Sequence, residues 1–290
     1  MDTAINHLSL CTGFAGIDLG IRRVLPTCRT ITYVEIEAFA IWNLVQKMEQ
    51  GKLDSAPVWT DLHTFNGKPY RGKVDVISGG FPCQPFSASG HRLGVDDPRN
   101  LFPAIKRIIR EVQPGLVFLE NVEGIITTKM HGKERTSVLL HVLGELERLG
   151  FTATWGMFSA EETGAPHRRN RVFIAAVANC DSSRGWENSL QAELRSERFV
   201  KPPCNSRKTD KRQAEQVKRW PARPEQEQHH WEEPRTIEPR LGGTTDGHSI
   251  GLDKSKHRLD RLRLLGNGVV PATAEVAFRT LFTQLREETQ

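Results

Sequence analysis

A cysteine in a glycine- and proline-rich segment has the chemistry of a nucleophile. Residues 79–87 read G-G-F-P-C-Q-P-F-S, which puts Cys83 between Pro82 and Pro85. The segment follows an apolar run at residues 74–78, and reactive groups in open α/β sheets gather where strands end. A thiolate can bond to a substrate and later leave, so Cys83 is a candidate nucleophile. The alternative, from these residues alone, is a buried structural cysteine.

Acidic and basic side chains stand at the ends of two other apolar runs. Glu120 follows residues 116–119 and is a candidate proton donor. Arg169 and Arg171 alternate just before residues 172–177, so both are expected to point to the same side of a strand. The alternatives are a helix-capping or surface carboxylate at Glu120 and a solvated basic edge at the arginines.

A glycine-rich loop near the amino end has the features of a nucleotide-binding turn. Residues 8–20 read L-S-L-C-T-G-F-A-G-I-D-L-G, an apolar run that enters a loop and then a helix-like stretch. Gly13 and Gly16 let the backbone turn sharply and approach a ligand closely. Glu35 follows at the spacing expected of an acidic partner for ribose hydroxyls. The fingerprint G-x-G-x-x-G is absent, which argues against a nicotinamide or flavin dehydrogenase.

The elements that must position these residues alternate along the chain. Short apolar runs rich in Val and Ile predict buried strands at residues 30–34, 74–78, 116–119 and 172–177. Apolar residues at helical spacing predict helices at residues 101–112, 138–149 and 272–285. This alternation predicts an α/β fold with a doubly wound, mostly parallel sheet.

Composition limits the remaining possibilities. The chain has 290 residues, 38% of them hydrophobic and 26% charged, and a formal net charge of +5, which permits a polyanionic partner. The sequence shows neither an apolar run long enough to span a bilayer nor a secretory signal, so we expect a cytoplasmic protein without a membrane partner. Five cysteines without a C-x-x-C pair predict neither a disulfide framework nor a metal site.

The composition changes after residue 178. Residues 179–240 are rich in Arg, Lys, Glu, Gln and Pro, with few aliphatic side chains, although three tryptophans lie among them. Apolar patterning resumes near Leu259. We therefore expect a first unit at residues 1–178, a short, polar, irregular insertion at 179–257, and a carboxyl-terminal segment at 258–290 that packs back on the first unit.

Several of these segments together resemble the motifs of the DNA cytosine-C5 methyltransferase family. Residues 79–87 resemble its nucleophile motif, and residues 116–123, L-V-F-L-E-N-V-E, its Glu-Asn-Val motif. Residues 164–173, G-A-P-H-R-R-N-R-V-F, resemble its arginine motif, and residues 264–271, L-L-G-N-G-V-V-P, its closing Gly-Asn motif. With the glycine loop they occur in the family's usual order and cover about residues 8–178 and 258–285.

The resemblance implies a Rossmann-like, S-adenosylmethionine-dependent enzyme. Such an enzyme methylates carbon 5 of cytosine in double-stranded DNA through a covalent Cys83 intermediate, after the target base has flipped out of the helix. The insertion at residues 179–257 would be the target-recognition region. We expect the protein to be a monomer that acts sequence-specifically. We expect it to belong to a restriction–modification or phage protection system with a cognate endonuclease.

The resemblance also assigns residues to roles. Cys83 would attack the ring, Glu120 would deliver a proton to ring N3, and Arg169 and Arg171 would belong to the target site. Glu35 would bind the ribose, Ile36 would face the adenine and Asp61 would accept from the adenine amino group. The full set expected around the cofactor is Cys11, Thr12, Gly13, Phe14, Gly16, Glu35, Ile36, Asp61, Leu62, Pro82, Leu101 and Asn267.

Three positions depart from the family pattern, and two alternatives remain open. Cys11 stands where the glycine loop usually begins with Phe, Ala15 replaces a common glycine, and His167 replaces a usual Gln. One alternative is a tRNA cytosine methyltransferase of the same superfamily. The other is a non-catalytic relative that binds DNA or the cofactor, which the short polar insertion favours and the retained Cys-Glu-Arg set argues against.

Overall fold

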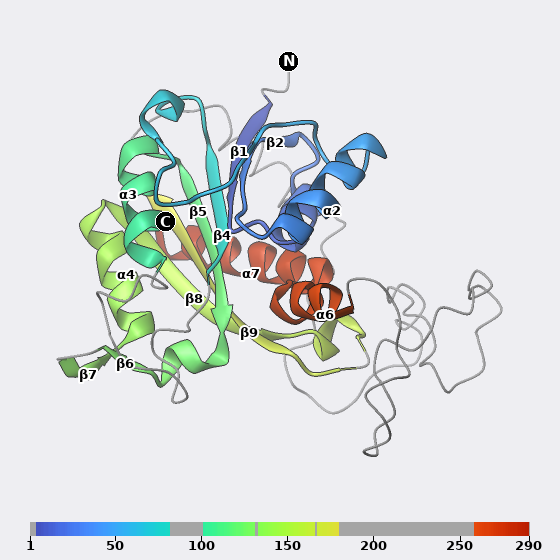
Figure 1. Ribbon diagram of the computed structural model, residues 1–290. Coiled ribbons are helices and arrows are strands. Elements are labelled where there is room, and N and C mark those ends of the chain that lie inside the picture. Colours follow the sequence, from blue (N-terminus) through green and yellow to red (C-terminus); the bar gives the residue numbers. More distant parts are fainter. Residues whose placement is uncertain (1–3, 82–100, 131–132, 166, 180–257, 290) are drawn as a thin grey trace.

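A seven-stranded, mostly parallel sheet forms the centre of the molecule. The computed structural model describes residues 4–81, 101–130, 133–165, 167–179 and 258–289 (Figure 1). The strand order is β3-β2-β1-β4-β5-β9-β8. The first five strands of this order, from β3 to β5, run parallel to one another. Strand β9 runs antiparallel to both of its neighbours, β5 and β8. The predicted doubly wound α/β fold is therefore confirmed.

The sheet strands are β1 (Ile5–Leu10), β2 (Cys28–Val34), β3 (Val58–Trp59), β4 (Val76–Gly80), β5 (Leu116–Val122), β8 (Phe151–Ser159) and β9 (Asn170–Ala178). The helices are α1 (Gly16–Val24), α2 (Ala38–Glu49), α3 (Phe102–Val112), α4 (Val138–Arg148), α6 (Arg258–Asn267) and α7 (Pro271–Thr289). Short 3₁₀ turns lie at Lys68–Tyr70, Glu123–Ile126 and Glu161–Thr163, and a small hairpin joins β6 (Lys129–Met130) to β7 (Lys133–Ser137).

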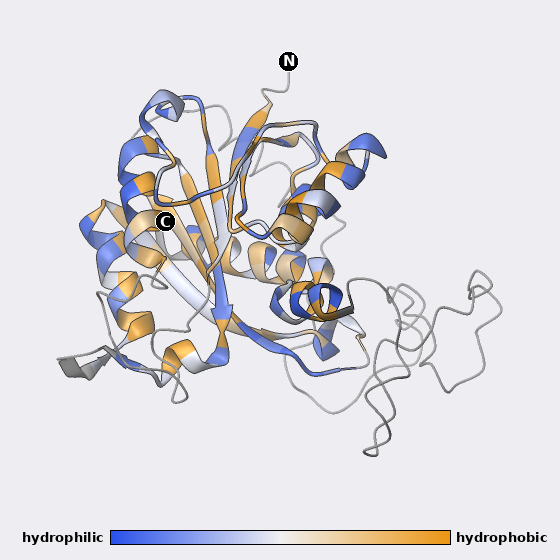
Figure 2. Cartoon of the chain, in the orientation of Figure 1, coloured by the Kyte–Doolittle hydropathy of each residue, from blue (hydrophilic) through white to orange (hydrophobic). Residues whose placement is uncertain are grey.

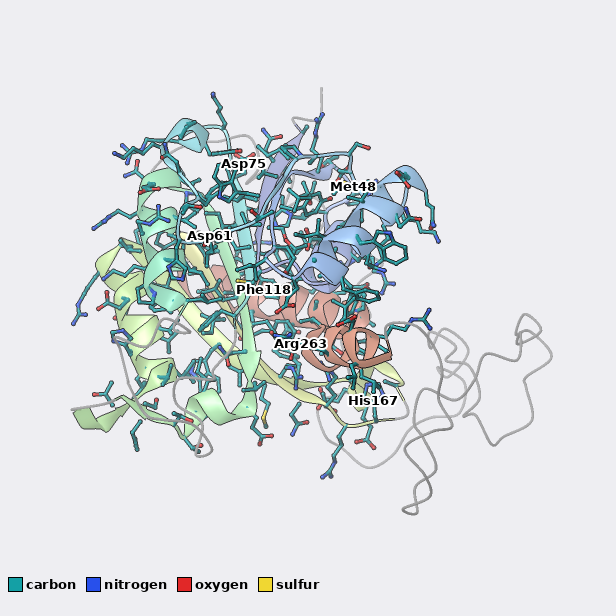
Figure 3. The ribbon with its side chains drawn as sticks, in the orientation of Figure 1. Met48, Asp61, Asp75, Phe118, His167 and Arg263 are labelled. Atoms are coloured by element: carbon teal, nitrogen blue, oxygen red, sulfur yellow. The ribbon has the colours of Figure 1, made fainter. Side chains whose placement is uncertain are left out.

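Alternating side chains of the strands feed two cores, one on each face of the sheet. Along β5, Val117 and Leu119 pack with helices α3 and α4. Leu116 and Phe118 point to the other face and pack with α1 and α7. Figure 2 shows the apolar strands between helices whose outer faces are hydrophilic, and Figure 3 labels Phe118 at the centre of the molecule. Burial on both faces explains why the sequence showed these strands as apolar runs.

The boundaries differ from the expected ones in a way that affects the site. Strand β5 continues three residues beyond the predicted end, so Glu120 lies within the strand rather than after it. Strand β8 was not predicted, because it is an edge strand of alternating polar and apolar residues instead of a buried run.

Helix α7 packs against α1 and against β8 and β9. Cys83, Pro82 and residues 180–257 lie outside the described residues, so the three-part division of the chain remains a prediction.

None of the helices in the described ranges is both long enough and apolar enough to cross a membrane.

Candidate active site

The glycine loop between β1 and α1 is held in an unusual backbone conformation. Cys11, Gly13 and Ala15 have φ angles of 49°, 56° and 67°, in the left-handed region. Two of these residues carry a Cβ, which costs about 1–3 kcal/mol each and requires surrounding contacts to hold it. Ala15, which stands where the family commonly has glycine, accordingly fits the loop only under strain. The backbone N–H of Thr12 donates to Val34 O at 3.2 Å, which ties the loop to the end of β2.

Glu35, directly after β2, fixes the loop from the side. Its Oε2 accepts the Gly13 N–H at 2.7 Å, and its Oε1 accepts the Glu37 N–H at 2.8 Å. A carboxylate oxygen has room for more than one donor, so both oxygens can still accept hydroxyl groups. A Cβ on Gly13 would meet nothing within 4 Å, so open space lies beside the loop at this point.

An exposed apolar surface adjoins Glu35. Ile36 is 69% exposed, although it follows a buried strand. The Glu35 N–H donates to Trp59 O at 2.9 Å, so the end of β3 lies beside it, and the Trp59 ring is itself half exposed. Asp61 follows two residues later and accepts the His63 N–H through Oδ1 at 2.8 Å. The residues that were expected to bind ribose and adenine thus lie at one edge of the sheet.

Of the other residues expected around the cofactor, some contact the connection between α6 and α7 and others lie in or against the core beside α3. Phe14 packs against Gly268, where a Cβ would overlap its ring, and Gly16 packs against Val269 O, where a Cβ would overlap the carbonyl oxygen. This brings the connection between α6 and α7 onto the loop, and Asn267 is exposed just before it. Leu62 is buried in the core shared with α3, and Leu101 is half-buried against that core.

Glu120 lies in β5 beside the last residue of β4, two residues before β5 ends. Gly80 is its register partner, and a Cβ on Gly80 would lie 3.0 Å from Glu120 Oε2 and 3.6 Å from Ile17 at the start of α1. Glu120 as a whole residue is 5% exposed. Burial raises the pKa of Glu120 to about 7, against the opposing effect of Arg171 and Arg169. Near neutral pH this carboxyl can therefore either hold or release a proton.

The two arginines have different partners. Arg171, in β9, places Nε 2.8 Å from Glu120 Oε1, although the two are not aligned as a hydrogen bond. Arg169 has a φ of 41° and precedes β9, and its guanidinium donates to Gly266 O at 2.6 Å and also to Gly268 O. His167 and Arg263 mark this side of the molecule in Figure 3. Arg171 thus faces the buried carboxyl, while Arg169 also holds the connection between α6 and α7.

Asn121 links β5 to the last described residue before Cys83. Its side-chain amide donates to Phe81 O at 2.8 Å, and its Oδ1 accepts the Val122 N–H at 2.8 Å. The Glu-Asn-Val segment was recognised in the sequence, but no role was assigned to Asn121. Its signal was a polar residue inside an apolar strand, since a buried amide needs partners.

The described cysteines are poor nucleophiles at neutral pH. Burial, and secondarily Glu35, raise the pKa of the Cys11 thiol to about 12, and burial also raises that of Cys28. Both therefore remain protonated thiols, the unreactive form. A thiolate nucleophile would have to come from elsewhere in the chain, as the assignment to Cys83 requires.

Comparisons with known proteins identify the family of the chain. A family model described as C-5 cytosine-specific DNA methylase matches residues 5–228. The type II methyltransferase M.NgoMIV of Neisseria gonorrhoeae is 32% identical over 172 residues, which cover 59% of this chain and 51% of that protein. The type II methyltransferase M1.ScrFI of Lactococcus lactis subsp. cremoris is 43% identical over 168 residues, 58% of this chain and 40% of that protein.

The chain spans about half the length of the curated relatives it matches. Among solved structures, the S. pombe Dnmt2 methyltransferase aligns with 62% of this chain and 53% of its own, at 21% identity and a TM-score of 0.48.

Proposed function

Because the chain belongs to the family of C-5 cytosine-specific DNA methylases, we propose that it transfers a methyl group from S-adenosylmethionine to carbon 5 of cytosine in double-stranded DNA. The buried Glu120 carboxyl carries the proposal. It has a pKa of about 7, lies beside Arg171 and stands opposite Gly80, three residues before Cys83. A group that donates a proton to a heterocycle near neutral pH needs these properties.

Each side chain has a chemical task in this reaction. The Cys83 thiolate adds to carbon 6 of the ring, and Glu120 gives its proton to N3, so negative charge does not accumulate on the base. Carbon 5 then becomes nucleophilic. Addition of the methyl group leaves S-adenosylhomocysteine. Water then takes the proton from carbon 5, the bond between sulfur and carbon 6 breaks to release the Cys83 thiolate, and the N3 proton returns to Glu120. Arg171 keeps the Glu120 carboxyl oriented throughout, and Arg169 completes the target site. Because a stacked base cannot reach this position, the cytosine must flip out of the duplex.

The residues at the glycine loop fit the proposed cofactor. Open space lies beside Gly13, Glu35 is fixed with acceptor capacity left for two hydroxyl groups, and Ile36 offers exposed apolar surface to a flat ring. Asp61 would accept from the adenine amino group. Cys11 to Gly16 would surround the methionine end, with Leu62, Leu101 and Asn267 at the margins and Pro82 on the side of the nucleophile. When bound, S-adenosylmethionine supplies an electrophilic methyl group on sulfur.

The names of the relatives support a setting for the reaction. They are named type II methyltransferases, which supports a sequence-specific role in a restriction–modification or phage protection system with a cognate endonuclease. Residues 179–257 would read the DNA sequence, and residues 1–178 with 258–290 would carry out the chemistry as a monomer. The net charge of +5 is compatible with a polyanionic substrate.

A covalent trap tests the proposal. DNA that contains 5-fluorocytosine is incubated with the protein and S-adenosylmethionine, and the adduct is measured on a denaturing gel. Fluorine cannot leave carbon 5 as a proton does, so wild type should form a stable adduct and Cys83→Ala none. If no DNA yields an adduct with wild type, the proposed chemistry is wrong, and a non-catalytic binding protein is favoured.

The polymer is tested separately. Methyl transfer to DNA and to tRNA is assayed in parallel, and labelling of tRNA alone would replace the DNA assignment with the tRNA alternative. Bisulfite sequencing of DNA from cells that express the protein then gives the methylated base and its sequence context.

A further inference from the structure

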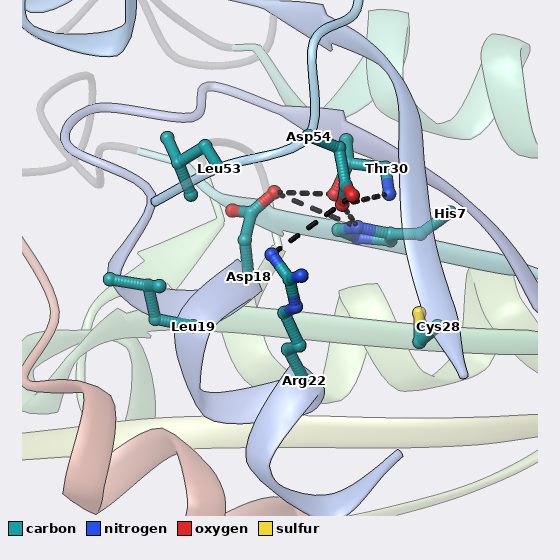
Figure 4. A pocket seen from close by; sticks show the side chains of 8 residues that line it. All are labelled: His7, Asp18, Leu19, Arg22, Cys28, Thr30, Leu53 and Asp54. Carbon is teal, nitrogen blue, oxygen red and sulfur yellow. Dashed lines mark hydrogen bonds and ion pairs between the residues drawn. The ribbon is translucent and has the colours of Figure 1, made fainter. Parts of the chain in front are cut away.

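A buried carboxylate that no step of the proposed reaction uses lies beneath the glycine loop. Asp18, in the first turn of α1, is 6% exposed and lies among the buried side chains of Ser9, His7 and Thr30. Figure 4 shows it pointing from α1 toward His7 and Thr30 on the neighbouring strands. A buried carboxylate is costly unless donors surround it, so each of its contacts has to be identified.

One chain of donors connects Asp18 to the loop. The Thr12 hydroxyl donates to Ser9 Oγ at 3.0 Å, and the Ser9 hydroxyl donates to Asp18 Oδ2 at 3.0 Å. Burial raises the pKa of Asp18, against the opposing effect of His7 and of the hydrogen bonds from Ser9 and Thr30. In its ionised form the carboxylate can only accept, so it fixes the direction of the Ser9 hydroxyl and leaves the Ser9 oxygen as the acceptor for Thr12. The same hydroxyl also lies 3.2 Å from Ser9 O and 3.4 Å from Val34 O, and Ser9 Oγ is the nearest of these three acceptors. Thr12 is thus linked to Asp18 through one intermediate side chain.

A second chain reaches the other carboxylate oxygen from the opposite side. The Thr30 hydroxyl donates to Asp18 Oδ1 at 3.3 Å, and Thr30 Oγ1 lies 2.9 Å from His7 Nδ1. His7 Nε2 lies 2.8 Å from Ser78 Oγ. Burial lowers the pKa of His7, which favours the neutral ring. A neutral ring protonated on Nδ1 donates to Thr30 and accepts from Ser78, so every group in both chains has a partner.

The loop needs such support because of its backbone. Thr12 lies between Cys11, which has a left-handed φ, and Gly13, whose N–H is already held by Glu35. Two consecutive residues are therefore fixed, one from below by the chain to Asp18 and one from the side by a carboxylate. Pre-formed loops bind ligands more tightly because less ordering remains to be done on binding.

We propose that Asp18 is a positioning residue which, through Ser9 and Thr12, holds the glycine loop in the conformation that binds the methionine end of S-adenosylmethionine. The inference rests on the proposed function, since it needs that loop to bind this cofactor. Asp18 itself does not contact the cofactor.

Binding of S-adenosylhomocysteine, measured by calorimetry, tests the proposal without relying on catalysis. Ser9→Ala, Asp18→Asn and Thr12→Val each break the chain between carboxylate and loop, and each should bind about three- to tenfold more weakly than wild type. Thr12→Ser keeps the hydroxyl and should bind more tightly than Thr12→Val. Thr30→Val is the matched control, because it removes a buried donor from the same carboxylate without touching the loop. Its affinity should stay within about twofold of wild type, although its unfolding midpoint falls.

The outcomes separate the two proposals. If wild type binds no S-adenosylhomocysteine, the proposed function fails. If wild type binds it, the positioning role is refuted either when Ser9→Ala and Thr12→Val bind as tightly as wild type or when Thr30→Val loses as much affinity as they do. Should Asp18→Asn not unfold cooperatively, Ser9→Ala and the Thr12 pair decide.

Discussion

Gly80 and Glu120 face each other across the parallel strands β4 and β5, and the carboxyl occupies the space that a side chain on Gly80 would need. A Cβ there would stand 3.0 Å from Glu120 Oε2, tighter than ordinary packing. The missing side chain lets the carboxyl reach over the end of β4, from which the chain continues into the segment of Cys83. The proton donor of the proposed reaction thus lies in β5, and the nucleophile follows the end of the adjacent strand β4 in the sequence.

The protonation of Glu120 should control the rate at alkaline pH. Because the pKa of this carboxyl is raised to about 7, its protonated fraction falls as the pH rises through that value. Adduct formation on 5-fluorocytosine DNA should slow over the same range. Glu120→Gln should lower the rate by about 10²–10⁴ and abolish this decline. Rapid-quench trapping from pH 6 to 9 measures both, and a decline that persists in the Gln variant would assign it to another group.

Removing the neighbouring positive charge should move that alkaline decline to higher pH. Arg171 opposes the effect of burial on the pKa of Glu120, so Arg171→Met should raise this pKa above about 7. The variant is slower overall, but the midpoint of its pH profile is the informative quantity. Arg168→Met is the control, because Arg168 is solvent-exposed and lies near Glu161 instead. A midpoint that shifts downward, or equally in both variants, contradicts the assignment.

The two arginines show where sequence reasoning reaches its limit. Alternation predicted that Arg169 and Arg171 point to the same side, but this rule holds only inside a strand, and β9 begins at Asn170. Arg169 lies before it with a left-handed φ, so its guanidinium also reaches the carbonyls at the end of α6. Those carbonyls lie 97 and 99 residues away in the sequence, and nothing local indicates the contact.

Arg169 should therefore affect the cofactor loop as well as the target site. Its guanidinium binds Gly266 O and Gly268 O, and Gly268 packs against Phe14 of the loop. Both hydrogen bonds come from one nitrogen, Nη2, and Arg169→Met removes them together, so S-adenosylhomocysteine should bind about three- to tenfold more weakly. Arg168→Met serves as control in the same titration. Unchanged affinity in Arg169→Met would confine this residue to the DNA side.

The buried strands and the helices could be predicted from the sequence, whereas the edge strand and the polar residues inside strands could not. Strands with two buried faces, such as β4 and β5, stood out as apolar runs, and the helices α3, α4 and α7 showed regular apolar spacing. The edge strand β8 did not, because Phe151 is its one buried residue and the others are half-buried or exposed. Polar residues inside the strands, such as Ser9 and Asn121, were overlooked because their roles depend on partners that only the packed sheet brings near.

Asn121 should matter for the nucleophile but not for the cofactor. Its amide holds Phe81 O at 2.8 Å, two residues before Cys83. Asn121→Ala loses this hydrogen bond and leaves a carbonyl without its donor, so adduct formation should slow by about three- to tenfold while S-adenosylhomocysteine binds as in wild type. Asn170→Ala removes an exposed amide that contacts Glu123 and provides the comparison. Equal slowing in both variants would show that the effect is not specific to the Phe81 contact.

Two glycines offer a direct test of how closely the carboxyl-terminal connection rests on the loop. A Cβ on Gly16 would overlap the carbonyl oxygen of Val269, and backbone cannot rotate away as a side chain can. Gly16→Ala should lower the free energy of unfolding by about 1–3 kcal/mol and weaken cofactor binding. Gly144 lies in helix α4 with open space around its Cβ position, so Gly144→Ala should instead stabilise the protein by about 0.5–1 kcal/mol. Urea unfolding measures both changes, and a Gly16→Ala variant as stable as wild type would mean that the loop and the connection between α6 and α7 are not in contact.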